Sequence, residues 1–200
     1  VSNTSNGAGA GYTTTTGASN TAVGYHALYL NTTAGENTAV GKSALSANTE
    51  GSYNTAFGSQ ALIGNVTGTH NSALGYQAMQ GTVTGTYNVG IGHHCMYQAV
   101  DPDHCVAIGQ NALEQVEGNG NTAVGSGSAI AISSGTHNVA IGYQCSEVLS
   151  TGTHNTAIGA NAVVAATTNN QIAIGYSTAV TGQYGIGIGN NVDAGEDDCV

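Results

Sequence analysis

Asn, Thr, Ala, an aliphatic residue and Gly follow one another at a regular distance along this chain. The first copy is Asn20-Thr-Ala-Val-Gly24, and we call the glycine that ends each copy the marker glycine. Successive marker glycines are mostly seventeen residues apart, with some intervals of sixteen and one of fourteen. The pattern therefore describes eleven repeats, whose marker glycines are Gly24, Gly41, Gly58, Gly75, Gly92, Gly109, Gly125, Gly142, Gly159, Gly175 and Gly189.

The repeat predicts an all-β fold, a parallel β-solenoid of about eleven rungs. Seventeen residues are too few for the two helices of a helical repeat, and frequent glycine disfavours helix. The Ala and the aliphatic residue after it lie on opposite sides of one strand. We predict that the aliphatic column, which begins with Val23 and Val40, fills the inside of the coil. The Ala column, which begins with Ala22, is then expected on the outside, packed against another chain.

The predicted solenoid spans residues 19–192, preceded by a lead-in or partial rung over 1–18 and followed by an acidic tail over 193–200. An Asn precedes the predicted strand in most rungs. Because Asn tolerates turn conformations and bonds nearby amides, this column predicts a corner with a side-chain amide ladder. A polar stripe that binds glycan is the alternative interpretation. The column comprises Asn20, Asn37, Asn54, Asn71, Asn88, Asn121, Asn138 and Asn155.

The repeat units resemble those of trimeric autotransporter adhesin heads, and more closely those of bacteriophage tail fibres. The similar units are NTAVGYHAL at 20–28, NTAVGKSAL at 37–45 and NSALGYQAM at 71–79. The resemblance covers about residues 19–192. It implies a left-handed parallel β-roll and a homotrimer in which the small-residue faces of three rolls turn inward.

Composition and charge argue against several classes of function. Eleven acidic residues stand against the single cation Lys42, so the formal net charge is −10. This charge disfavours nucleic acid and anionic membranes as partners. No apolar run approaches the roughly 18 residues of a membrane span, so we expect no membrane insertion. No Ser/His/Asp set, paired acid or cationic clamp recurs, and we predict neither an enzyme nor a cofactor.

His and Tyr exchange within one column of the repeat, which we call the ring column. Such exchange predicts a flat, half-exposed ring stacked on the rung below, because a catalytic base or a metal ligand would not be replaced by Tyr. Ring faces stack on sugars, so this column is the first candidate for contact with a neutral glycan. Its predicted members are Tyr53, His70, Tyr87, His137 and His154.

The segment Asp101-Pro102-Asp103 stands where other rungs have a turn glycine. Because proline cannot adopt a positive φ, we expect the loop to take a different path here. A protruding loop would make Asp101 and Asp103 recognition residues. A kinked, solvated turn is the alternative.

The cysteines do not predict an intrachain disulfide framework. Cys95 and Cys145 replace a small Ala three residues after the marker glycine, and their rungs are too far apart for a disulfide. We expect buried free thiols there, with an interchain disulfide at a trimer axis as the alternative. Cys105 replaces a corner Asn, and the state of Cys199 in the tail is open.

Two other clusters are not predicted to bind metal. The spacing of His93, His94, Cys95 and His104 matches no zinc pattern. The acidic run from Asp193 to Asp198 lacks the alternating oxygen ligands of a calcium loop, so a frayed terminus is expected.

These observations predict a non-enzymatic structural and attachment segment of an extracellular or virion fibre, similar to a tail fibre. As a trimer it would bind a host-surface glycan or receptor multivalently. A bacterial adhesin head or extracellular filament subunit is one alternative. An ice-binding solenoid is another, because Thr pairs such as Thr67 and Thr69 recur at one corner. The end rungs carry no cap, so either the chain continues on both sides or subunits stack end to end into a fibre.

Overall fold

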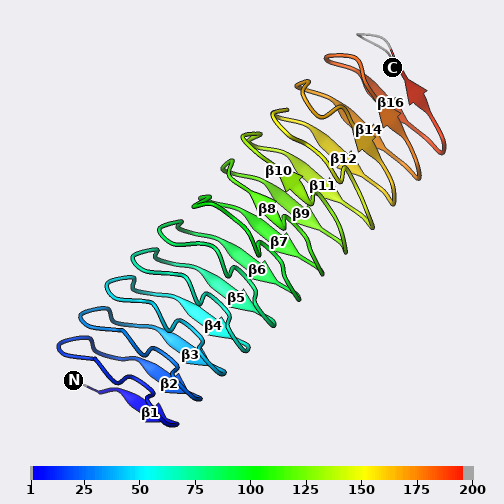
Figure 1. The fold of residues 1–200 in the computed structure, drawn as a ribbon. Helices are drawn as coiled ribbons and strands as arrows, with labels where there is room; N and C mark the ends of the chain where they lie inside the picture. The colour runs from blue at the N-terminus through cyan, green and yellow to red at the C-terminus, as the bar shows by residue number, and fades with distance from the viewer. Residues whose placement is uncertain (1, 196–200) are drawn as a thin grey trace.

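The computed structural model describes residues 2–195 as a rod of stacked coils (Figure 1). The chain makes one circuit, rises, and repeats the same path about seventeen residues later. The described residues form β-strands and turns and contain no helix. The predicted all-β parallel solenoid is therefore confirmed.

One parallel sheet of twelve strands runs the length of the rod. Neighbouring strands pair in register, so that Ala22 lies beside Ala39 and Ala39 beside Ala56. The strands, in spatial order, are β1 (Thr4–Asn6), β2 (Thr21–Val23), β3 (Thr38–Val40), β4 (Thr55–Phe57), β5 (Ser72–Leu74), β6 (Val89–Ile91), β7 (Val106–Ile108), β9 (Thr122–Val124), β11 (Val139–Ile141), β12 (Thr156–Ile158), β14 (Ile172–Ile174) and β16 (Ile186–Ile188).

Short strands also form on a second side of the rod, in its C-terminal half. β8 (Gln115–Val116) pairs with β10 (Ala131–Ile132), and β13 (Val163–Val164), β15 (Ala179–Val180) and β17 (Asp193–Ala194) form a three-stranded sheet.

The two end segments contribute strands to these sheets. β1 extends the main sheet into the segment predicted as a lead-in or partial rung. β17 brings the start of the predicted acidic tail into the solenoid. The rest of that tail, residues 196–200 with Cys199, lies outside the described residues.

The prediction of which strand side faces inward is wrong. The Ala column is buried, with Ala39 and Ala56 at 0% exposure, whereas Phe57 in the aliphatic column is 54% exposed. The coil is too narrow for larger side chains beneath the main sheet. The main sheet has Ala at this position in most coils, and at Gly90, where Met79 and Cys95 stand in place of Leu and Ala, even a Cβ would lie 2.6 Å from the Cγ of Met79. Side chains from the side of the coil opposite the main sheet therefore fill the interior.

A column of Leu and Met supplies most of that filling. Leu28, Leu45, Leu62, Met79, Met96 and Leu113 are fully buried, and each has a left-handed φ between 49° and 55°. In later coils the column becomes small, as Ala129 and Ser146. Ile132 and Leu149, three residues further along, are then buried instead. The interior volume is thus kept while the residue that fills it changes.

The Asn corner is confirmed as an amide ladder. The Oδ1 of Asn37 accepts a hydrogen bond from the backbone N–H of Asn54 at 2.8 Å, and its Nδ2 donates to the carbonyl of Gly51 at 2.9 Å. A second buried ladder was not predicted. There the Nδ2 of Asn48 donates to the Oδ1 of Asn31, and the Nδ2 of Asn65 to the Oδ1 of Asn48.

The marker glycines are required at the turn that leaves the main sheet. Gly75 has φ +138°, and a Cβ there would lie 2.5 Å from the carbonyl oxygen of Gly92. Both the backbone conformation and the close approach of the next coil exclude a side chain.

Candidate functional site

The ring column forms a continuous stack over four coils. Its ring centroids are 4.8 Å apart from Tyr53 to His70, 4.7 Å from His70 to Tyr87 and 5.1 Å from Tyr87 to His104. His137 and His154 form a second stack at 5.2 Å. The predicted stacking is confirmed. His104 was missed as a member, although it precedes the corner residue Cys105 as the other rings precede Asn.

This stacking limits how the ring column could contact a ligand. Each inner ring has both faces against its neighbours, so its outward edge is what solvent reaches. Gly120 interrupts the column between His104 and His137. The column therefore offers hydrogen-bonding edges along most of its length, rather than the open faces on which sugars stack.

The carboxylates of Asp101 and Asp103 accept hydrogen bonds from backbone N–H groups of the preceding coil. The Oδ1 of Asp101 accepts hydrogen bonds from the N–H groups of Val83 and Thr84 at 2.8 and 2.7 Å, and the Oδ1 of Asp103 accepts from Thr86. Partial burial raises the pKa of the Asp101 carboxyl, but the backbone hydrogen bonds, led by that from Thr84, outweigh it and leave the pKa lowered.

The expected change of path is found at the residue before Pro102 and not at the proline itself. Asp101 has φ 45°, a left-handed value that Thr84, its counterpart one coil earlier, does not have. The Asp101 carboxylate accepts the bonds from Val83 and Thr84, where the backbone carbonyl of Val83 accepts the equivalent bonds one coil earlier.

Pro102 keeps the position of the turn glycine. Its carbonyl accepts a hydrogen bond from Asn88 Nδ2 at 2.6 Å, as the carbonyl of Gly85 does from Asn71. The turn glycines of this column have no positive φ. Gly85 is small because a Cβ would overlap the carbonyl oxygen of Pro102. Proline is therefore compatible with the turn.

A second group of rings lies on another corner. His93 and His94 stack at 3.9 Å, Tyr97 lies 4.3 Å from His94, and Tyr76 extends the group toward the preceding coil. Burial, followed by the charge of His93, lowers the pKa of His94. His104 belongs to the ring column instead. Among residues 2–195 no group of three His, Cys, Asp or Glu side chains is placed to hold a metal ion.

The three described cysteines are buried and free, as predicted for Cys95 and Cys145. Burial raises the pKa of Cys95 to about 12 and those of Cys105 and Cys145 to about 11. Cys105 takes over the hydrogen bonds of the corner Asn, because its Sγ donates to the carbonyl of Gly118 and accepts from the N–H of Asn121. These thiols are structural.

The outer side of the main sheet carries an apolar band from β2 to β16. Because the strands are in register, the aliphatic column forms one unbroken line about 50 Å long. Bands of this size on a soluble protein mark interaction surfaces. The most exposed members are Phe57, Leu74, Ile91, Ile108, Ile141, Ile158 and Ile188.

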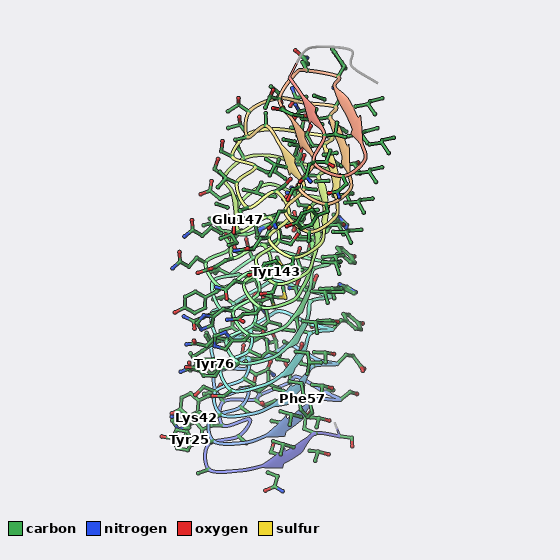
Figure 2. The ribbon with its side chains drawn as sticks, turned by 90° about the vertical axis from the view of Figure 1, so that its right-hand side faces the viewer. Tyr25, Lys42, Phe57, Tyr76, Tyr143 and Glu147 are labelled. Atoms are coloured by element: carbon green, nitrogen blue, oxygen red, sulfur yellow. The ribbon has the colours of Figure 1, made fainter. Side chains whose placement is uncertain are left out.

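Two hollows lie on the side of the rod that carries the short strands. The first has a volume of about 130 Å³ and includes Gln98, Gln115 and Glu117 in its lining. The second, about 350 Å³, is lined by Gln144, Glu147, Val148, Asn161 and Val163. Figure 2 shows Glu147, with Tyr25, Lys42 and Tyr76, on the edge of the rod away from Phe57.

No family model, curated protein or solved structure matches the chain. Within residues 2–195 there is also no helix long and apolar enough to cross a membrane.

Proposed function

We propose that this chain is a non-enzymatic structural and attachment segment of an extracellular or virion fibre, similar to a tail fibre. In this proposal three left-handed rolls associate as a homotrimer. The observation that carries it is the apolar band on the main sheet, which runs from β2 to β16 and is exposed in the single chain.

The band supports association with further copies of the same chain. A line of aliphatic side chains that follows the coil repeat is matched in length and spacing by an identical line on a second copy. The proposed contact uses the aliphatic column, not the Ala column, because the latter is buried inside each coil.

Trimer formation would serve attachment through multivalency. Three copies present every outward surface three times, and linked contacts exceed the strength of a single contact by about 10²–10⁴. The net charge of −10 suits a neutral or cationic surface partner.

The oligomeric state tests this proposal. Light scattering on the purified chain should give three times the 19.8 kDa chain mass. Phe57→Asp, which places a charge in the band, should give monomers and weaken adsorption to host cells about a hundredfold. Leu30→Asp is the matched control, because Leu30 is 42% exposed outside the band. A monomeric wild-type chain would refute the proposal.

A further inference from the structure

The larger hollow is a notch where the rod changes its cross-section. Cys145 and Leu149 both point inward and are separated by three residues, whereas Ala162 and Val164 in the next coil are separated by Val163 alone. Glu147 and Val148 thus project beyond the coil that follows. We call Glu147 and Val148 the ledge. The notch is lined by this ledge and by Asn161 and Val163 of the next coil.

The ledge leaves a backbone edge open. Ala131 and Val148 form a parallel bridge in which Ala131 donates to the carbonyl of Glu147 and accepts from the N–H of Leu149. In a parallel ladder the N–H and C=O of Val148 then point away from Ala131. β13 is the first strand of its sheet, so within residues 2–195 no strand pairs with Val148 on that side.

Apolar and polar groups meet in this notch. Val148 and Val163 are 54% and 44% exposed and give it an apolar surface. The side-chain amides of Gln144 and Asn161 and the carboxylate of Glu147 complete its lining. The hollow has a volume of about 350 Å³, at the lower end of the range of small-molecule sites, and is wide open to solvent, so a ligand there stays partly exposed.

We propose that the notch binds a neutral sugar unit of a glycan. A pyranose has an apolar face for the two valines and hydroxyl groups for the amides, the carboxylate and the free edge of Val148. The Glu147 carboxylate disfavours sialylated and sulfated sugars. The inference rests on the proposed attachment function, and it replaces the ring column as the main contact.

The smaller hollow extends the site along the rod. Ala131 lines it and is bridged to Val148 at the notch, so one lining residue of each hollow takes part in the same backbone contact. Gln98 and Gln115 are hydrogen-bonded to each other there at 3.0 Å. A linear glycan that occupies both hollows should bind more tightly than a single sugar.

Calorimetric titration of the whole chain tests the inference with cellohexaose, maltohexaose, N-acetylated chitohexaose and a heparin hexasaccharide. At least one neutral probe should bind saturably, and more tightly than its monosaccharide. Val163→Trp should abolish binding by filling the notch, and Glu147→Gln should weaken it about tenfold. Glu114→Gln, in the same column two coils earlier, should leave it unchanged.

Three results would overturn the inference: no saturable binding of any neutral probe at millimolar concentration, equal binding by a folded Val163→Trp chain, or preference for heparin. Circular dichroism checks that each variant is folded. A trimer that binds no neutral glycan would contradict only this inference, whereas a monomer would contradict the proposed function.

Discussion

At the scale of single residues, the narrow coil sets what each position can hold. Only Cβ-sized groups fit beneath the main sheet, and the marker glycine has no room for even that. Leucine is buried in left-handed backbone, a conformation that costs an L-residue about 1–2 kcal/mol. Burial of the Leu28 side chain, which is 1% exposed, offsets this cost.

The marker glycine can be tested by Gly75→Ala. A Cβ at φ +138° and 2.5 Å from the carbonyl oxygen of Gly92 should lower the free energy of unfolding by about 2–5 kcal/mol. Gly127→Asn is the control. Gly127 has φ +67°, and a Cβ added there would lie 3.4 Å from its nearest neighbour, the Cγ of Gln144. Thermal denaturation should separate the two variants, and equal stability would contradict the steric argument.

At the scale of elements, the strands of the main sheet are short, and side chains reinforce the links between coils. The two Asn ladders and the Asp101 carboxylate each connect one coil to the next. Asp101 thereby keeps the Pro102 turn bonded to the preceding coil, although its backbone at φ 45° differs from that of the glycine turns.

The Asp101 link predicts a dependence on pH. Its folded-state pKa is lowered, so its contribution to stability is present above the unfolded pKa, near 3.8, and is lost as the pH falls through the folded value. Asp101→Asn should therefore be less stable than wild type at neutral pH, and the difference should shrink below pH 3.8. Urea denaturation across this range measures it, and a constant difference would contradict the prediction.

At the scale of the whole molecule, each coil contacts only its neighbours, so stability is shared along the rod. The buried thiols of Cys95, Cys105 and Cys145 lie in three different coils, so their reactivity measures how readily each of those coils opens.

Thiol labelling can follow the opening of the rod. In a Cys199→Ser chain, labelling of the three buried thiols in native buffer should be roughly a thousandfold slower than that of a free thiol, because the thiolate is the reactive form. Both burial and the raised pKa of about 12 for Cys95 reduce the accessible thiolate. Rapid labelling of any one of them in the folded chain would show that its coil opens independently.

The repeat predicted the solenoid and its strand register because Asn, Ala and Gly each have a steric role that recurs in every coil. It did not predict the inward side, since both the Ala22 and the Val23 columns are apolar. The notch was also missed. The sequence feature that marks the notch is Ser146 in the column that holds Leu or Met in earlier coils, with Leu149 filling the interior instead. Whether this feature produces a hollow depends on the geometry of two adjacent coils.

The in-register stacking has a consequence for how such a rod could change in length. Each seventeen-residue unit meets its neighbours through the same carbonyls, amides and alanines, so the insertion or duplication of a whole unit would create no new kind of junction. Growth in steps of about 4.8 Å would then be available by simple genetic duplication. Coils of sixteen and fourteen residues also keep the strand register, so an inserted unit must preserve the alignment of the strands rather than a fixed length of seventeen residues.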